Sequence, residues 1–207
     1  MARVRLRDAR TADGERALYS GTYPEGYRHD VWPDHVERVA ASMGMIRRYA
    51  SRFGTAADLS CGDGAILRGL SWLREIWIGD LNKTPLDWSG GALVHRLDPG
   101  PLPESLDRLL EPVDLYVLSE TIEHMDDPDG LLRRLTDVSR YLFLSTPLDE
   151  KPETGNVEHY WSWGQADMHQ MLQDAGWSPL EVETLVPEST RHMDNPYHYQ
   201  LWMAVHR

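Results

Sequence analysis

Short apolar runs recur along the chain, and most of them stop at an acidic or small polar residue. The clearest runs span residues 55–58, 75–80, 92–98, 113–118 and 141–146. Short runs of this kind, rich in Val, Ile, Leu and aromatic side chains, are typical of buried strands. A small-residue turn and a helix-like segment follow the first run, so the pattern predicts an α/β fold.

Helical periodicity occupies other stretches. From Pro33 to Phe53, apolar residues recur every three or four positions, and Gly54 suits the end of such a helix. Residues 129–138 and 165–175 also read as helices, whereas 180–186 and 199–205 read as the closing strands. The residues before Pro33 are rich in Arg, Asp, Gly and Tyr and show no sustained apolar period. We expect them to form a leader in front of the folded core.

The turn after the first run is the most informative segment. Asp58 ends the run, and a Ser-Cys-Gly-Asp-Gly turn follows over residues 60–64. Glycine permits a left-handed backbone and leaves room for close approach, so such a turn can bring backbone N–H groups to a ligand. The second run ends at Asp80, and an acid about 20 residues after the glycines is suited to holding ribose hydroxyls. Together these features indicate a nucleoside site at the strand ends.

In order and spacing, these motifs resemble the class I S-adenosylmethionine-dependent methyltransferases, and specifically their small-molecule branch. The matching segments are the acid and glycine turn at 58–64, Asp80, Leu97-Asp98 ahead of Leu102-Pro103, the Glu-x-x-Glu-His stretch at 120–128, the His-aromatic stretch at 158–163 and the helix end at 168–177. The resemblance implies a Rossmann-like, doubly wound, mostly parallel seven-stranded sheet with an antiparallel last strand. Residues 33–207 would form this single domain, and residues 1–32 a leader or lid.

The resemblance also implies that S-adenosyl-L-methionine is the cofactor. The residues expected to bind it are Asp58, Ser60, Gly62, Gly64, Asp80, Leu81, Asp98 and Ser119. Ser60 stands where the family has its first glycine, and a serine fits there only with a negative φ. Asp63 adds a negative charge that would repel a pyrophosphate, which favours a cationic sulfonium over a dinucleotide. A solvated turn carboxylate explains Asp63 equally well.

The implied activity is methyl transfer to an oxygen or nitrogen of a small-molecule acceptor, and neither the atom nor the molecule follows from the sequence. An acceptor that loses a proton needs a base near neutrality, and His124 and His159 stand where the family has its active-site mouth. Each could instead be structural, bonded to the backbone or packed among aromatic residues. The residues expected to contact the acceptor are Tyr23, Tyr27, Arg28, His29 and Glu120.

Two other functions stay open. If residues 120–124 are helical, Glu120, Glu123 and His124 share a face, and with His159 they resemble the metal-binding set of the small-RNA 3′-end 2′-O-methyltransferases. The same motif occurs in metal-free relatives, in which the acids cap a helix and line the pocket, so the leading expectation is no metal. The other possibility is a non-catalytic binding or scaffold protein, which Ser60 favours and the acids at three strand ends oppose.

Composition limits the partners and the setting. The 207-residue chain has a formal net charge of −12, which disfavours nucleic acid because such binding depends mainly on Lys and Arg at phosphates. No stretch reaches the roughly 18 apolar residues of a membrane span, and no apolar core follows the N-terminal arginines as in a signal peptide. A lone cysteine, Cys61, excludes an internal disulfide. We expect a cytoplasmic enzyme with a small-molecule partner, and the oligomeric state stays open.

Overall fold

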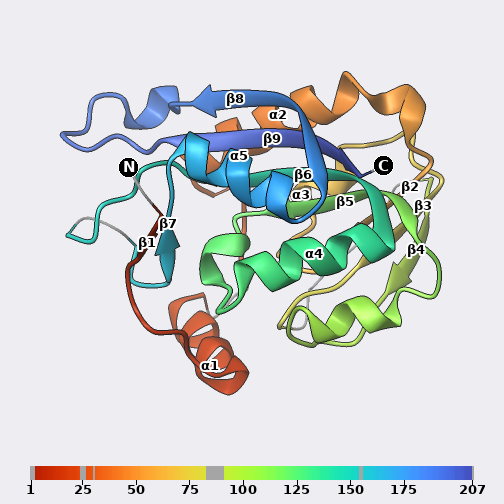
Figure 1. The fold of residues 1–207 in the computed structure, drawn as a ribbon, viewed down its shortest axis with the longest axis horizontal. Helices are drawn as coiled ribbons and strands as arrows, with labels where there is room; N and C mark the ends of the chain where they lie inside the picture. Colours follow the sequence, from red (N-terminus) through yellow and green to blue (C-terminus); the bar gives the residue numbers. More distant parts are fainter. Residues whose placement is uncertain (1–2, 24–26, 30, 83–90, 154–155, 207) are drawn as a thin grey trace.

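The computed structural model of the chain describes residues 3–23, 27–29, 31–82, 91–153 and 156–206 (Figure 1). In this part of the chain, seven strands form one sheet in the order β4-β3-β2-β5-β6-β9-β8. They are β2 (Thr55–Asp58), β3 (Glu75–Ile78), β4 (Leu93–Arg96), β5 (Val113–Ser119), β6 (Ser139–Pro147), β8 (Trp177–Leu185) and β9 (Tyr199–His206). Each run that the sequence marked as a strand therefore lies in this sheet.

The strand directions make the sheet doubly wound. β2 pairs in parallel with β3 and β5, β3 with β4, and β5 with β6, whereas β9 runs antiparallel to both β6 and β8. The chain moves outward from β2 to β4 and then returns to the other side of β2 at β5. A crevice opens at the carboxyl ends of the strands where the order reverses. The predicted mostly parallel seven-stranded sheet with an antiparallel last strand is confirmed.

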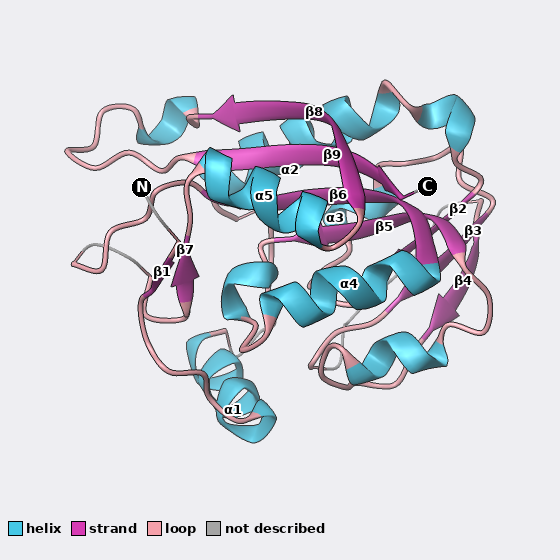
Figure 2. Cartoon of the chain, viewed as in Figure 1, coloured by secondary structure: helices cyan, strands magenta, loops and turns pink. Residues whose placement is uncertain are grey.

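Helices cover both faces of the sheet (Figure 2). One core contains α2 (Pro33–Arg47) and α3 (Ala65–Arg68), and the other contains α4 (Pro128–Val138) and α5 (Gln165–Asp174). Along β5, Leu115 and Val117 belong to the first core, and Tyr116 and Leu118 to the second. Successive side chains of a strand point to opposite faces, so strands covered on both sides read as continuous apolar runs.

The start of α4 shows how local signals set an element. Asp127 Oδ1 accepts a hydrogen bond from the Gly130 N–H at 2.8 Å, and Pro128 occupies the first turn, where a missing N–H costs little. The helix runs to Val138, and β6 begins at the next residue. This cap fixes where the chain leaves residues 120–127, a segment that carries several candidate site residues.

The N-terminal residues lie outside these layers. β1 (Val4–Arg5) pairs antiparallel with β7 (Trp161–Ser162), and α1 (Ala12–Thr22) lies beside the body rather than over a sheet face (Figure 1). The sequence did not predict α1, because two glycines and few apolar residues hide its periodicity. Its first turn is capped by Thr11, whose hydroxyl accepts from the Gly14 N–H at 3.2 Å. The domain boundary expected after residue 32 stays a prediction.

Short 3₁₀ turns connect several elements, namely η1 (Ala50–Arg52), η2 (Glu104–Arg108), η3 (Ile122–His124) and η4 (Glu188–Thr190). The helix expected over 33–53 ends at Arg47, so its predicted end is wrong. Tertiary contacts explain the early end, since the Tyr49 hydroxyl donates to Glu181 Oε2 at 3.0 Å and Phe53 packs into the core. No helix among the described residues combines the length and the apolar character that a membrane crossing needs.

Candidate active site

A cleft of about 1910 Å³ opens at the carboxyl ends of the parallel strands. Its walls come from the strand ends, from leader residues between Ala9 and Trp32, from the start of α2, and from the segment that follows β6. Sites for one small molecule commonly measure roughly 300–1,000 Å³. The cleft is therefore large enough for two small ligands at once.

The glycine turn forms one part of this cleft. Gly62 has a left-handed backbone, with φ of 53°. Asp80, just after β3, accepts hydrogen bonds from the backbone N–H groups of Gly62 at 2.8 Å and Asn82 at 3.0 Å, and burial raises its pKa. A Cβ on Gly62 would come within 3.3 Å of His29 and 3.4 Å of Tyr27. The turn is thus a close-fitting cradle with a carboxylate beside it.

The residues predicted to bind the cofactor fall into two groups. Those that line the cleft are Ser60, Gly62, Asp80, Leu81 and Ser119, and those outside its lining are Asp58, Gly64 and Asp98. Asp58 is buried under the turn, where its Oδ1 accepts from the Ser60 N–H at 3.1 Å, and burial raises its pKa to about 7. Gly64 has φ of 70° and stands directly before α3, and Asp98 is exposed. Asp58 and Gly64 therefore shape the turn from behind.

Ser60 and Asp63 have partners that the sequence did not reveal. Among the described non-glycine residues, positive φ occurs at Glu120 and Asp149, so Ser60 fills its position without backbone strain. Asp63 is buried, and it accepts from the His29 N–H at 3.0 Å and pairs with His29 Nδ1 at 2.5 Å. Asp63 is therefore not a solvated turn residue. Burial acts to raise the pKa of Asp63, but the hydrogen bonds from His29 outweigh it and lower the pKa. Arg68 Nη2 lies 3.5 Å from Asp63 Oδ2, so the carboxylate keeps its charge beside the turn.

Aromatic side chains of the leader stand near this turn. Tyr27 packs edge to face against Tyr23 and His29, with ring centroids 5.0 and 4.9 Å away, and Trp32 lies 5.7 Å from Tyr23. Of the residues predicted to contact the acceptor, Tyr23, Tyr27, His29 and Glu120 line the cleft, whereas Arg28 is exposed and outside its lining. The leader thus supplies an aromatic wall.

Glu120 leaves β5 in a left-handed conformation, with φ of 49°. The following 3₁₀ turn begins only at Ile122, so the helical geometry assumed for the metal hypothesis is wrong. The Glu120 carboxylate instead accepts a hydrogen bond from Ser145 Oγ at 2.9 Å. Glu120 therefore stands apart from the cluster that its neighbours form.

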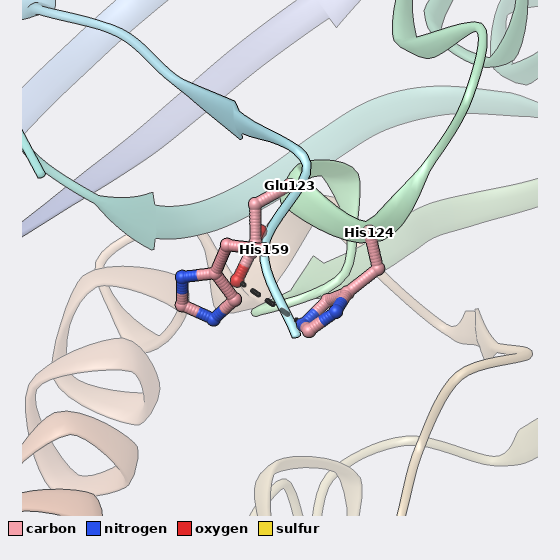
Figure 3. A group of neighbouring side chains, drawn as sticks. All are labelled: Glu123, His124 and His159. Carbon is pink, nitrogen blue, oxygen red and sulfur yellow. Dashed lines mark ion pairs between the residues drawn. The ribbon is translucent and has the colours of Figure 1, made fainter. Parts of the chain in front are cut away.

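That cluster consists of Glu123, His124 and His159, which extend toward one another from two segments (Figure 3). Each offers one ligand atom, and these atoms lie within 4.8 Å of one another. Glu123 is fully buried, and its Oε2 accepts from Thr146 Oγ1 at 3.0 Å. Its Oε1 lies 3.8 Å from His124 Nε2 and has no hydrogen-bond partner among the described residues. Burial, reinforced by the charge of Glu120, raises the pKa of Glu123 to about 8. The rings of His124 and His159 meet edge to face, with centroids 4.9 Å apart.

Both imidazole rings are held through Nδ1. His159 Nδ1 pairs with Glu150 Oε2 at 2.6 Å, and His124 Nδ1 lies 2.9 Å from the carbonyl oxygen of Glu158. When each Nδ1 donates, each Nε2 keeps its lone pair. Burial lowers the pKa of His124 to about 3. Burial acts the same way on His159, but the hydrogen bond to Glu150 and the nearby carboxylates outweigh it and raise the pKa. His159 is therefore the stronger base.

A second polar group ties the leader to the His159 segment. The Tyr160 hydroxyl donates to Glu15 Oε1, and Arg10 Nη1 lies 3.2 Å from the same oxygen. The Arg10 backbone N–H donates to the Tyr160 hydroxyl at 2.9 Å. Glu15 Oε2 is buried and has no hydrogen-bond partner in the part of the chain that the structure describes, and Glu158 is buried nearby. Glu15 and Tyr160 are 145 positions apart, so no sequence spacing pointed to this group.

Tyr19 connects the two polar groups. Its hydroxyl lies 3.4 Å from His124 Nδ1, and its side chain lines the cleft. Burial raises the pKa of Tyr19, and the charges of Glu158, Glu15 and Glu123 raise it further. Three carboxylates therefore stand around one tyrosine, a feature of the site that the sequence analysis did not identify.

Arg38 is a buried cation behind the same wall. It is fully buried in α2, and its Nη1 donates to Ser119 Oγ at 2.6 Å, while Nε and Nη2 have no hydrogen-bond partner within the described ranges. Burial acts to lower the pKa of Arg38, but the charge of Glu120 and the nearby tyrosines raise it. An arginine on the apolar face of the expected helix was the signal available in the sequence. Its charge offsets that of Glu120.

Comparison with known proteins gives matches among solved structures only, since no family model and no curated protein sequence matches the chain. Magnesium protoporphyrin IX methyltransferase (ChlM) from Synechocystis PCC 6803, crystallised with S-adenosylmethionine, matches with a TM-score of 0.66 and 16% identity, over 97% of this chain and 100% of that one. The 1,6-didemethyltoxoflavin-N1-methyltransferase from Burkholderia thailandensis was crystallised with 1,6-didemethyltoxoflavin and S-adenosylhomocysteine. It matches with a TM-score of 0.66 and 14% identity, over 97% of this chain and 92% of that one.

A third match carries a different reaction in its name. The [4+2]-cyclase SpnF gives a TM-score of 0.57 and 12% identity, over 79% of this chain and 80% of that one. At identities this low, the likeness establishes the fold, and function has to be argued from the site. The chain has the fold of the class I S-adenosylmethionine-dependent methyltransferases, as the sequence resemblance implied.

Proposed function

We propose that the protein is an S-adenosylmethionine-dependent methyltransferase that acts on an oxygen or nitrogen of a small molecule. One observation carries this proposal: a single cleft is lined both by the cradle of Gly62 and Asp80 and by the pair of His159 and Glu150. The cradle suits a nucleoside cofactor, and the pair suits a proton acceptor. Two proteins of the same fold, ChlM and the toxoflavin enzyme, were crystallised with this cofactor or its demethylated product.

The residues of the cradle fit the proposed cofactor. The Asp80 carboxylate would hold the ribose hydroxyls, and the backbone of residues 60–64 would lie against the ligand, with His29 and Tyr27 packed beside Gly62. When bound, S-adenosylmethionine supplies an electrophilic methyl group on a sulfonium centre. Ser119 and Leu81 line the same cleft and are proposed as further contacts, with Asp58 and Gly64 supporting the turn.

His159 is the proposed general base. A hydroxyl or ammonium acceptor has to lose a proton when it is methylated. Glu150 holds Nδ1 of His159 at 2.6 Å and raises its pKa, so Nε2 can accept that proton. His124 is the weaker base, because burial lowers its pKa to about 3, and we assign it to orienting the acceptor.

The leader supplies the proposed acceptor contacts. Tyr23, Tyr27 and His29 line the cleft from this segment, and Glu120 lines it from the end of β5. Because His29 is bonded to Asp63 in the glycine turn, acceptor contacts and cofactor cradle meet in one place. This arrangement favours simultaneous binding of both ligands, as methyl transfer requires.

Calorimetry with S-adenosylhomocysteine and S-adenosylmethionine tests the proposal. We expect binding by the wild type and by the control Asp13→Asn, whose side chain is exposed. Asp80→Asn removes the charged acceptor of the ribose hydroxyls and should weaken binding about tenfold or more, which corresponds to ~1.4 kcal/mol. Failure of the folded wild type to bind either compound would overturn the enzyme assignment and favour a scaffold role.

A second candidate function is metal-assisted methylation of a hydroxyl, because Glu123, His124 and His159 present converging ligand atoms. Two imidazoles and one carboxylate suit Mn²⁺, Fe²⁺ or Zn²⁺. Glu150 and the Glu158 carbonyl would orient the two rings as outer partners. The net charge of −12 argues against the RNA acceptor that the sequence resemblance raised.

Metal titration separates this candidate from the first. Chelator-treated protein would be titrated with Mn²⁺ by calorimetry, alongside Glu123→Gln and the exposed control Glu153→Gln. Stoichiometric binding that is lost in Glu123→Gln and kept in Glu153→Gln would support the metal-assisted reaction. Equal Mn²⁺ binding by both variants, or no Mn²⁺ binding by the wild type, would exclude the metal-assisted reaction.

A further inference from the structure

The part of the cleft around Tyr19 has more negative than positive charge. Glu15 and Glu158 both line it, and both are buried, with 7% and 5% of their surface exposed. Arg10 offsets Glu15 through an ion pair at 3.2 Å, and its other terminal nitrogen donates to a backbone carbonyl. Among the described residues, Glu158 has no ion-pair partner. Burial and the charge of Glu15 raise the pKa of Glu158 and outweigh the charges of His159 and Arg10, which act to lower it. The two carboxylates therefore share a cation, Arg10, and a further positive charge from a ligand would be stabilised here.

Unused hydrogen-bond acceptors point the same way. Glu15 Oε1 is occupied by Tyr160 and Arg10, but Glu15 Oε2 is buried and has no partner in the described part of the chain. A buried acceptor that receives no hydrogen bond costs about 1–3 kcal/mol of stability. The missing partner is therefore a hydrogen-bond donor, and the charge of the surroundings makes a cationic donor the best fit.

The neighbouring rings favour an organic cation over a metal ion. Tyr19 and Tyr23 both line the cleft, and their ring centroids are 5.9 Å apart. Aromatic faces attract alkylammonium groups, which also bring N–H donors for carboxylates. Among the described residues, the group of three ligand atoms that converge within 4.8 Å consists of Glu123, His124 and His159 and includes neither Glu15 nor Glu158.

We infer that the acceptor carries a protonated amine, which binds beside Tyr19 against the carboxylates of Glu15 and Glu158. This inference rests on the proposed function and narrows its substrate class. An acceptor with a phosphate or carboxylate at this end would meet like charge and is rejected. Recognition here is separate from the cofactor cradle, so the subsite can be tested without knowing the full acceptor.

A matched pair of probes tests the charge. 2-Phenylethylamine and 2-phenylethanol have similar shapes but differ in charge near neutral pH. Binding of each would be measured by ligand-observed NMR in EDTA, so that no metal occupies the neighbouring cluster, with and without S-adenosylhomocysteine. We expect the amine to bind about tenfold more tightly than the alcohol. The protein variants are Glu158→Gln and, as a control, Glu104→Gln, an exposed cleft residue in η2.

The outcomes are distinct. In Glu158→Gln the preference for the amine should fall to about twofold or less, whereas Glu104→Gln should keep it. Equal binding of the two probes, no binding of either, or a preference unchanged in Glu158→Gln would overturn the inference. Unchanged S-adenosylhomocysteine binding in Glu158→Gln shows that the variant is folded. An amine preference without any S-adenosylhomocysteine binding by the wild type would keep the subsite and reject the methyltransferase.

Discussion

His29 and Asp63 join the leader to the glycine turn through two contacts with one carboxylate. The His29 N–H donates to Asp63 Oδ2 at 3.0 Å, and His29 Nδ1 lies 2.5 Å from Oδ1. The same Oδ1 accepts the Ala65 N–H at 3.1 Å, where α3 begins. One buried carboxylate thus organises the turn and seats the leader beside it. The cofactor cradle and the wall of aromatic side chains are therefore mechanically coupled.

Loss of this carboxylate should weaken ligand binding. Asp63→Asn keeps the shape but removes the charge-assisted bond to His29, worth about 1–3 kcal/mol. We expect S-adenosylhomocysteine to bind about tenfold more weakly, because the leader residues are no longer held at the turn. Calorimetry measures the affinity, and limited proteolysis would show earlier cleavage near His29. Unchanged affinity and cleavage would contradict the coupling. Asp13→Asn, at an exposed helix position, is the control.

The stability of the protein should fall in mild acid because of His35. Burial, aided by the charge of Arg38, lowers the pKa of His35 to about 4, compared with about 6.5 in an unfolded chain. Between pH 6.5 and pH 4 the unfolded chain binds a proton at His35 that the folded protein does not bind. The contribution of His35 to stability is therefore present above pH 6.5 and is lost as the pH falls toward 4. The free energy of unfolding should drop by up to ~1.4 kcal/mol per pH unit.

Denaturant unfolding from pH 7 to 4 measures that slope. His35→Gln removes one of two buried histidines whose pKa is lowered, the other being His124, so it should make the profile shallower without abolishing the slope. His169→Gln, an exposed change in α5, should leave the profile as in the wild type. Parallel profiles for the wild type and His35→Gln would show that another group causes the loss.

Two glycine substitutions should change stability in opposite directions. Gly62→Ala places a side chain at φ of 53°, with its Cβ 3.3 Å from His29 and 3.4 Å from Tyr27. Such strain costs about 1–3 kcal/mol. Gly44→Ala lies inside α2 with no heavy atom within 4 Å of the new Cβ, and it should stabilise the protein by about 0.5–1 kcal/mol. Thermal unfolding measures the change in stability of both variants. A Gly62→Ala variant as stable as the wild type would contradict the close contact of Gly62 with His29 and Tyr27.

Glu150 should control the protonation of His159. Its hydrogen bond is the main influence that outweighs burial, so Glu150→Gln should lower the pKa of His159. NMR titration of the imidazole Cε1 protons in metal-free protein measures the shift, with the exposed Glu153→Gln as control. Once an acceptor is known, the acidic limb of the pH–rate profile should move to lower pH in Glu150→Gln, because a weaker base is deprotonated sooner. If the pKa of His159 stayed the same in Glu150→Gln, a group other than Glu150 would be raising it.

The sequence by itself determined the sheet and the position of the cradle. Strands end near Asp58 and Asp80 because apolar runs covered on both faces, followed by a glycine turn, are local patterns with few alternatives. The caps and turns at α4 follow from the same short-range chemistry. These features need only the neighbouring residues, so they could be predicted with their approximate bounds.

Only the tertiary structure decided how the site is assembled. Asp63 meets His29 and Glu15 meets Tyr160 because the leader docks beside the strand ends, and both contacts join residues far apart in the chain. Glu120 leaves the expected cluster because its backbone turns left-handed, which no periodicity predicts. Contacts of this kind depend on which distant surfaces pack together and on the burial that results. The charge states of His159 and its neighbours follow from that packing, not from the motif that contains them.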